Sequence, residues 1–312
     1  MNRQAPPHRY SRERTTYWFD PQAEPVYDLP PGERVVIETL DAASGRLQSH
    51  EDLMPYLAWR SPERSNPATG PFRVLGAEAG DELVVHVEAI RLAPRGWTRL
   101  TLGVGAMKHD IEDHLLSFVD VQGEAGDELV FDFGIRLPAR PMVGVIGTAL
   151  PDRAISTAHP GPHGGNLDFN DLTAGTVAHL PVWVPGARFG IGDVHATMGD
   201  GEVSGAAVEI AGEVTLRVDL RKGTRLERPW FETPESWITY ACAPRLEDAV
   251  RDSIGYMATL LAARLGVTRP QAYLLITARG DVRIGQAADC GLDTTVRVLF
   301  PKIEPVRQAL RF

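Results

Sequence analysis

Short alternating runs of apolar and polar residues, separated by glycine and proline, constrain the fold of this chain more than any other feature. The clearest alternation is D-E-L-V-V-H-V-E-A-I at 81–90, and V-T-L-R-V-D-L at 214–220 repeats the pattern. Because residues two apart lie on the same face of a strand, these runs predict half-buried β-strands. The 30 glycines and 24 prolines break most of the chain into runs too short for helices. Residues up to about 225 are therefore predicted to form antiparallel β-structure.

Helical periodicity appears late in the sequence. Apolar residues recur at helical spacing from 246 to 265, and Gly266 is a typical stop signal. Thr268 is predicted to cap a second short helix that ends near Ala278, with Pro270 tolerated in the first turn. These features predict a helical hairpin near the C-terminus.

Together these patterns predict an α+β fold. We expect a predominantly antiparallel β-sandwich-like body with a C-terminal helical hairpin packed on it. Residues 1–30 are polar and rich in Arg and Pro, and they are expected to form an N-terminal arm. Residues 31–312 are expected to form one catalytic domain, in which the helical subregion covers about 246–278.

Charge and apolar content restrict the partners of this chain. Its 32 basic and 41 acidic residues give a net charge of −9, which argues against a nucleic-acid partner because phosphate backbones require a basic surface. No apolar run approaches the roughly 18 residues of a membrane helix, and the N-terminus lacks the apolar core of a signal peptide. Cys242 and Cys290 form no disulfide framework and are expected to be buried small residues. We therefore expect a cytoplasmic protein without a membrane partner.

Residues 159–205 concentrate Gly, Asn, Asp, His and Glu, which rarely fill a protein core. In H-P-G-P-H-G-G-N-L-D at 159–168, two glycines allow a ligand to approach the backbone, and Asn and Asp tolerate turn geometry. An ordinary Gly-Asn turn is the alternative. The candidate residues for a site in this loop are His163, Gly164, Gly165, Asn166 and Asp168.

Asp193 and His195 form an Asp-x-His pair in G-D-V-H-A. In an extended segment the two side chains point the same way, so a carboxylate oxygen and an imidazole nitrogen can bind one ion. A mixed set of oxygen and nitrogen ligands suits zinc or a similar divalent metal. The alternative is a strand end with a solvated Asp and a hydrogen-bonded His.

Four further acids are candidates for chemistry. Glu38 and Asp41 end the apolar strand V-V-I-E-T-L-D-A, where a half-buried carboxylate requires a partner cation or a raised pKa. Solvated acids at a strand end are the alternative. Glu202 lies in the turn G-D-G-E, and Glu209 alternates with Ala207 as expected for a buried acid on a strand.

Several catalytic signatures are missing from the sequence. It contains no G-x-S-x-G elbow around its serines, no phosphate-binding glycine loop and no H-E-x-x-H helix. Neither cysteine lies in a setting typical of a nucleophile. A covalent serine or cysteine hydrolase is therefore disfavoured.

Further polar and glycine-rich segments follow one another along the chain from about residue 30 to residue 302. Together with those described above they are E-T-L-D-A (38–42), N-P-A-T-G-P (66–71), P-M-V-G-V-I-G (141–147), H-G-G-N-L-D (163–168), G-D-V-H-A (192–196), G-D-G-E-V-S-G (199–205), E-V-T-L-R-V-D-L (213–220) and G-D-V-R-I-G-Q (280–286). In this order the segments resemble those of the acetamidase/formamidase family, and an ordered set of this kind is far more specific than any single motif.

The resemblance implies hydrolysis of a short aliphatic amide to a carboxylate and ammonia. It also implies a β-rich sandwich, a homodimer or higher homo-oligomer, and a divalent metal usually taken as zinc, with calcium as a candidate second ion. Carried over by position, the metal ligands would be Glu38, Asp41, Asp193 and His195. Asn166 and the amides of the two loop glycines would stabilise the oxyanion. His163 and Asp168 would contact substrate, and Glu202 or Glu209 would transfer the proton.

Two other functions remain open from the sequence. One is metal-dependent hydrolysis of a different C–N bond, such as a cyclic amide or a carbamate. The other is a noncatalytic ligand-binding relative on the same scaffold. The presence of both Asp193 and His195 favours an enzyme.

Overall fold

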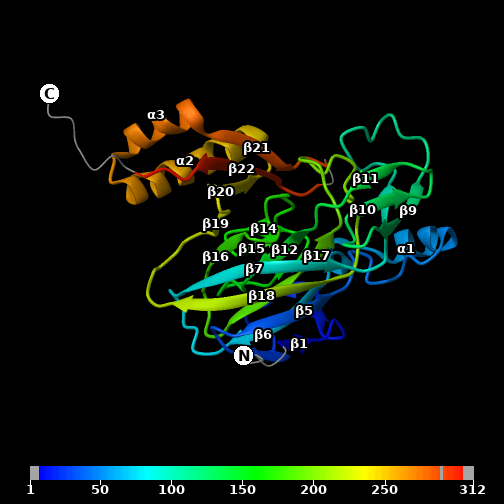
Figure 1. The fold of residues 1–312 in the computed structure, drawn as a ribbon, viewed down its shortest axis with the longest axis horizontal. Helices are drawn as coiled ribbons and strands as arrows, with labels where there is room; N and C mark the ends of the chain where they lie inside the picture. The colour runs from blue at the N-terminus through cyan, green and yellow to red at the C-terminus, as the bar shows by residue number, and fades with distance from the viewer. Residues whose placement is uncertain (1–6, 289–290, 305–312) are drawn as a thin grey trace.

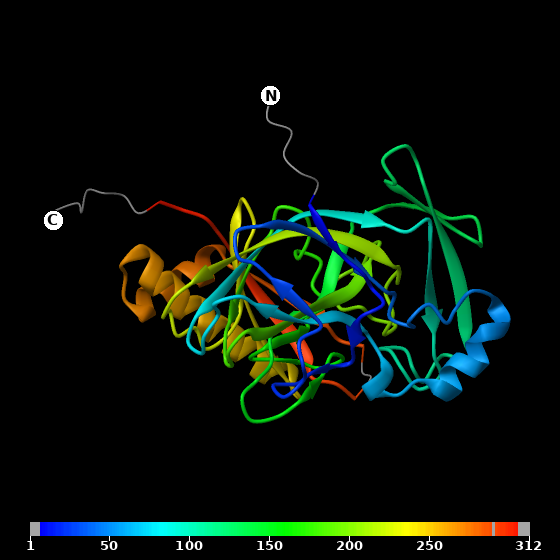
Figure 2. The same cartoon turned by 90° about the horizontal axis from the view of Figure 1, so that it is seen from below.

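The computed structural model describes residues 7–288 and 291–304, and its strands are assembled mainly into two large sheets (Figure 1). Nearly all strand pairs are antiparallel, and helices are few. The two large sheets pack face to face, and the C-terminal helices cover one end of the body (Figures 1 and 2). The predicted α+β class with an antiparallel sandwich-like body is confirmed.

The larger sheet has nine strands in the order β1-β5-β18-β7-β16-β19-β20-β22-β21. Its neighbouring antiparallel strands β7 and β18 contain the long alternating runs that the sequence predicted as strands. The nine strands are β1 (His8–Tyr10), β5 (Arg34–Thr39), β7 (Glu82–Leu92), β16 (Val177–Pro181), β18 (Gly212–Arg221), β19 (Trp230–Glu232), β20 (Ser236–Ala243), β21 (Asp281–Gln286) and β22 (Thr294–Pro301).

The second large sheet runs in the order β14-β15-β12-β17-β6-β2, and β4 pairs with β6 off this path. This sheet carries most of the motif segments. Its strands are β2 (Thr15–Thr16), β4 (Tyr27–Leu29), β6 (Ala68–Val74), β12 (Met142–Gly147), β14 (Pro160–Gly161), β15 (Gly164–Asn166) and β17 (Ala187–His195).

The main hydrophobic core lies between these two sheets. Val85 on β7 and Val214 on β18 contribute from one side, whereas Phe72 on β6, Ile146 on β12 and Ile191 on β17 contribute from the other. All of these side chains are fully buried. Burial of a side chain of this size stabilises the fold by roughly 1.5–3 kcal/mol, so this interface sets the distance between the sheets.

A four-stranded sheet in the order β11-β10-β9-β8 and the helix α1 lie at the end of the molecule opposite the C-terminal helices (Figures 1 and 2). Trp97 on β8 and Tyr56 on α1 join the two elements in a smaller hydrophobic cluster. The elements are β8 (Arg95–Leu100), β9 (Leu115–Gln122), β10 (Glu128–Phe131), β11 (Arg136–Pro138), the 3-10 helices η1 (His50–Asp52) and η2 (Pro62–Arg64), and α1 (Leu53–Trp59).

The C-terminal helical hairpin consists of α2 (Leu246–Leu265) and α3 (Arg269–Arg279), as predicted. Gly266 ends α2 in the left-handed conformation. The Thr268 side chain accepts a hydrogen bond from the backbone N–H of Gln271, which caps α3. Met257 and Leu261 on α2 pack against Val298 and Phe300 of β22.

The segment expected as an N-terminal arm contributes short strands to the body. β1 and β4 are added in parallel to β5 and β6, and β3 (Trp18–Phe19) pairs with β13 (Ile155–Ser156). Tyr10, Phe19 and Leu29 are buried, so residues 8–29 belong to the packed structure. Within the described residues, no helix is both long and apolar enough to span a membrane.

Candidate functional site

Asp193 and His195 lie at the end of β17, opposite β12. Asp193 has a positive φ of 55°, which places it outside regular strand geometry. Its carboxylate still reaches the imidazole of His195, with Oδ1 3.5 Å from Nε2. Both side chains are fully buried, so the alternative of a solvated Asp is excluded. The structure thus brings together the two residues of the predicted Asp-x-His pair.

Asp168 approaches this pair from the loop after β15. The backbone N–H groups of Leu167 and Asp168 both donate to the carbonyl of Gly144 on β12, which holds the loop against the sheet. Asp168 is fully buried, and Asp168, Asp193 and His195 each offer one ligand atom within 4.8 Å of the others. Asp168 was predicted to contact substrate, but its position suits a metal ligand equally well.

Glu202 and Glu209 reach the same imidazole from the connection between β17 and β18. His195, Glu202 and Glu209 form a second group whose ligand atoms lie within 4.8 Å of one another. Glu209 Oε2 is 3.3 Å from His195 Nε2. The backbone N–H of Ala207 donates to Glu202 Oε1 and to Glu209 Oε1, at 3.1 Å each, so one amide positions both acids.

The donor set fits a cation. Asp168 Oδ1, Asp193 Oδ1, Glu209 Oε2 and both ring nitrogens of His195 are buried and make no hydrogen bond to the described residues. Buried polar atoms are nearly always satisfied, so the unsatisfied carboxylate oxygens around this one imidazole fit a cation. Carboxylate oxygens with an imidazole nitrogen are ordinary ligands of zinc and related divalent metals.

Burial and mutual repulsion perturb the acids. Burial raises the pKa of Asp168 well above its ordinary value, and the charges of Glu202 and Asp193 raise it further. Burial and the Glu209 charge likewise raise the pKa of Asp193, to about 6. Burial opposes a charge on His195, but Glu209 and Asp193 outweigh it and raise the pKa of the imidazole. A cluster of this kind requires positive charge, which a proton or a metal ion can supply.

A glycine on β12 makes room for the cluster. A Cβ atom at Gly144 would lie 2.5 Å from Asp168 Oδ1 and 2.8 Å from Asp193 Oδ2. Such distances are shorter than any van der Waals contact, so any side chain at this position would displace the carboxylates. Sequence reasoning noted P-M-V-G-V-I-G only as part of the resemblance and assigned no role to this glycine.

Two amide side chains orient the acids, and sequence reasoning identified neither of them individually. Gln286, at the end of β21, donates through Nε2 to Asp168 Oδ2 at 2.8 Å and to Glu202 Oε2 at 3.0 Å. Asn66 donates through Nδ2 to Asp193 Oδ2 at 3.0 Å and to Asn166 Oδ1 at 3.2 Å. Both lie in motif segments of the family resemblance, and that was the available signal.

A cavity of about 100 Å³ leads to the cluster. Ligand pockets for drug-sized molecules are typically at least about 300 Å³, so only a small molecule fits this cavity. The three residues predicted to be catalytic, Asn166, Glu202 and Glu209, line this cavity. The wall of the cavity also includes Tyr56, Arg60, Asn66, Trp97, Arg99 and Gln286.

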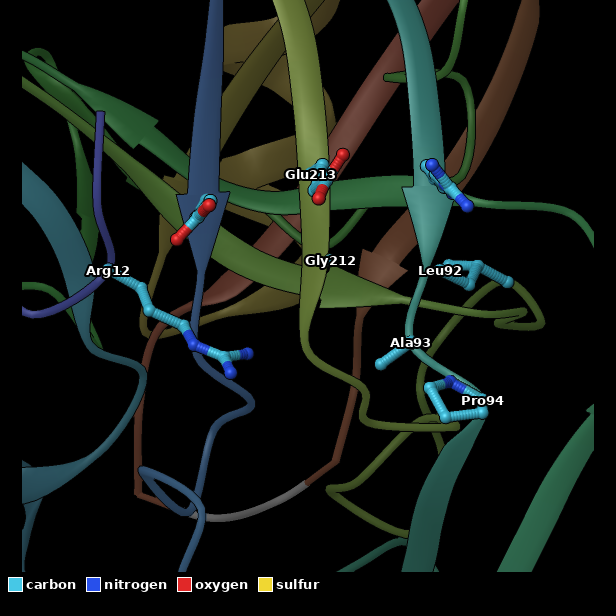
Figure 3. Close-up of a pocket in the computed structure, with 8 residues that line it drawn as sticks. Arg12, Leu92, Ala93, Pro94, Gly212 and Glu213 are labelled. Carbon is cyan, nitrogen blue, oxygen red and sulfur yellow. The ribbon is translucent and has the colours of Figure 1, made fainter. Parts of the chain in front are cut away.

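The structure does not bring Glu38 or Asp41 to the cluster. The Glu38 carboxylate forms an ion pair with Arg9 at 3.1 Å, and it lines an outer pocket of about 330 Å³ together with Arg12 and Glu213 (Figure 3). Asp41 Oδ1 accepts the backbone N–H of Ala43 at 2.8 Å, so this carboxylate caps a turn. Both positions have local partners, and we remove them from the set of candidate metal ligands.

His163, Gly164 and Gly165 lie beside the site without lining the cavity. The two glycines pair with β12 and β14 in the sheet, and a Cβ at Gly164 would lie 2.2 Å from the carbonyl oxygen of Ile146. Both glycines are therefore required for the close approach of these strands. The His163 ring is fully buried and packs edge-on against Phe19.

Cys242 is a free thiol that is half-buried on β20. Burial raises its pKa to about 11, so it carries almost no thiolate at neutral pH and is a poor nucleophile. Cys290 lies outside the described residues. The expectation that cysteine chemistry plays no part is consistent with the position of Cys242.

Known proteins are similar to this chain in sequence, and solved structures are similar to it in fold. A solved acetamidase from Bacillus halodurans is 36% identical, with a TM-score of 0.87 over 94% of this chain and 97% of that chain. A solved acetamidase from Yersinia enterocolitica is 30% identical, with a TM-score of 0.86 over 96% and 93%. A formamidase-like protein of Schizosaccharomyces pombe is 28% identical over 254 residues, and this match spans only 60% of its length.

The sequence profile of the Acetamidase/Formamidase family matches residues 3–159 and 149–301, which together cover nearly the whole chain. The motif resemblance is thereby confirmed along its full extent, as is the sandwich fold that it implied. The chain belongs to the acetamidase/formamidase family.

Proposed function

We propose that this protein hydrolyses a short aliphatic amide to a carboxylate and ammonia with the help of a divalent metal, zinc being the first candidate. The observation that carries the proposal is a cluster of buried carboxylate and imidazole atoms that make no hydrogen bond to the described residues, beside a small cavity that Glu202 and Glu209 line. Family membership supports the same reaction class.

Asp168, Asp193 and His195 are the residues we assign to the metal, with Glu209 as the further acid that faces the same imidazole. When bound, such an ion supplies a lowered water pKa near neutrality and polarises a carbonyl oxygen. Gln286 and Asn66 hold the carboxylates through the bonds described above, which fixes the direction of their remaining lone pairs.

Asn166 is placed to orient the substrate. Its Oδ1 accepts a hydrogen bond from Asn66, which turns its own NH2 group away from that contact, and its side chain lines the cavity. An amide N–H aimed at a carbonyl stabilises the negative charge that develops there during hydrolysis. We assign the substrate carbonyl to Asn166 in place of the loop glycines.

Glu202 is the residue we assign to proton transfer. Burial raises its pKa, so the carboxyl group can hold a proton closer to neutral pH than an exposed glutamate. Ammonia is expelled readily only when the amide nitrogen is protonated, so a carboxyl with a raised pKa beside the substrate is suited to this step. The residue lines the cavity, within reach of a bound molecule.

The proposal is tested by measuring ammonia release from formamide, acetamide and propionamide. The metal content of the protein is determined first, and release is measured before and after a chelator is added. We expect release that is lost on chelation and restored by zinc. Release that survives complete metal removal contradicts the metal dependence, and no release from any amide contradicts the reaction class.

The Glu202→Gln variant tests the proton carrier. We expect kcat to fall by about 10²-fold or more with the metal content unchanged. Glu213→Gln is the matched control, because Glu213 lies on the outer pocket and pairs with Arg9. Equal kcat in the two variants removes Glu202 from this role.

A further inference from the structure

Two arginines line the same cavity as the acid cluster. Arg99 lies at the end of β8, and only 7% of its surface is exposed. Arg60 follows α1 directly and is half-buried. The Nε atoms of both guanidinium groups are buried and make no hydrogen bond to the described residues. Nothing in the catalytic roles assigned above uses either side chain.

Neither arginine has an acidic partner within the described part of the chain. No described carboxylate oxygen lies within the 4.0 Å ion-pair distance of either guanidinium. The one hydrogen bond that the Arg99 side chain donates among these residues goes to the Thr101 hydroxyl. Glu202 and Glu209 act on Arg99 only through longer-range attraction, and the charge of Arg60 repels it.

Aromatic rings hold the Arg99 guanidinium in place without neutralising it. The group lies 5.8 Å from the centroid of the Tyr56 ring and 5.9 Å from that of Trp97. Contacts of this kind orient a cation and offset part of its desolvation. A buried charge without a counter-ion is costly, and two adjacent like charges are more so. A bound anion would offset this cost, because Glu202 and Glu209, which line the same cavity, reach Arg99 only through longer-range attraction.

We infer that the substrate is a short amide whose far end carries a carboxylate, which Arg99 and Arg60 bind while the amide group faces the acid cluster. This inference rests on the proposed amide hydrolysis. The planar guanidinium fork can bind the two oxygens of a carboxylate with two parallel hydrogen bonds. Hydrolysis adds water across the amide C–N bond, releases ammonia and leaves a dicarboxylate.

The cavity volume limits the length of such a substrate. About 100 Å³ accommodates an amide and a carboxylate separated by a very short carbon spacer. A neutral amide such as propionamide would occupy the inner end but would leave both arginines unpaired. Discrimination is expected to be strong, because a site built for a polar group is left unsatisfied by an analogue that lacks it.

Matched substrate pairs test the inference. Malonamate is compared with propionamide, and succinamate with butyramide, by the ratio of their kcat/KM values. We expect the wild type to favour the carboxylate-bearing amide by roughly tenfold to a hundredfold. Arg99→Met should lower this ratio at least tenfold, and Arg99→Lys should retain part of it.

Arg95→Met is the matched control, because Arg95 lies on the same strand as Arg99 but its side chain is exposed and pairs with Asp120. Its ratio should equal that of the wild type. If Arg99→Met does not fold, Arg60→Met takes its place. Hydrolysis of propionamide without a preference for malonamate, or a preference that survives both substitutions, overturns the inference.

A binding measurement separates this inference from the proposed reaction. Succinamate should raise the melting temperature of the wild type but not that of Arg99→Met or Arg60→Met, whether or not the amide is cleaved. Succinamate-dependent stabilisation without ammonia release contradicts amide hydrolysis and keeps the anion site. Ammonia release from neutral amides with no stabilisation by succinamate contradicts the anion site and keeps the hydrolysis.

Discussion

Arg297 on β22 is the most informative residue to remove, because one fully buried guanidinium joins two loops of the active site. Its Nε donates to Asp171 at 2.5 Å, and its Nη2 donates to Asp200 at 2.6 Å. Asp171 lies three residues after Asp168, and Asp200 lies two residues before Glu202. The Arg297→Met substitution should therefore destabilise the fold and misplace both acids.

The magnitude follows from burial. The Asp171 side chain is 15% exposed, and without Arg297 its remaining ion pair among the described residues would be with the exposed Arg283, 3.9 Å away, whereas Asp200 is 39% exposed and can be solvated. Removing one partner of a buried pair costs about 3–5 kcal/mol, and the lower end applies because only one acid is buried. For a chain of this length, about 3 kcal/mol corresponds to a fall in melting temperature of roughly 5 °C.

Denaturant unfolding and calorimetry measure the loss of stability. A fall in kcat/KM for an amide substrate measures the effect of the displaced acids on catalysis. Arg283→Met is the matched control, because Arg283 faces the same Asp171 from 3.9 Å but is 42% exposed. Its effect should be close to zero. The double variant Arg297→Met/Asp171→Asn should recover part of the stability. If Arg297→Met costs no more than Arg283→Met, the reasoning from burial is refuted.

Two further predictions follow from the site. Gly144→Ala should weaken metal binding by roughly tenfold to a hundredfold, because its Cβ would displace the ligand carboxylates. Gly199→Ala is the control and should bind metal normally, because no atom lies within 4 Å of its Cβ. The metal content of each variant after dialysis measures the difference. Burial lowers the pKa of His163 to about 3, so between pH 6.5 and 3 only the unfolded chain binds this proton and stability falls as the pH falls. The wild type should lose about 1.7 kcal/mol more than His163→Phe between pH 6.5 and 5, and identical pH profiles of unfolding would contradict the reasoning.

The fold was predictable because its signals are local. The alternation of apolar and polar residues over 81–90 and 214–220 is enough to predict strands. Gly266 and Thr268 predict the turn of the helical hairpin. The capping of α3 by Thr268 involves residues only three apart. Such patterns depend on residues that are close in sequence, so the elements they predict are found in the structure.

The candidate site was predictable only where its residues are neighbours in sequence. Asp193 and His195 were identified as a candidate metal-binding pair because they lie two residues apart on one strand. Glu38 has the same local appearance, but the parallel pairing of β1 with β5 brings Arg9 beside it. Gln286 is 118 residues from Asp168, and no local pattern predicts that contact.

The backbone conformation at the site is a further reason why the sequence alone did not predict how its residues are arranged. Asn66, Asp168, Asp193 and Glu202 all have positive φ, between 40° and 55°. Asn and Asp tolerate this region, but a glutamate there is strained by about 1 kcal/mol or more, which surrounding contacts must offset. The two bonds that Glu202 makes, with Ala207 N–H and Gln286 Nε2, provide that compensation. Local preference therefore points away from the observed geometry at the very residues that converge on the cluster. A site whose backbone is held by distant partners cannot be deduced from its own segment, and a family pattern is needed to indicate that the segments belong together.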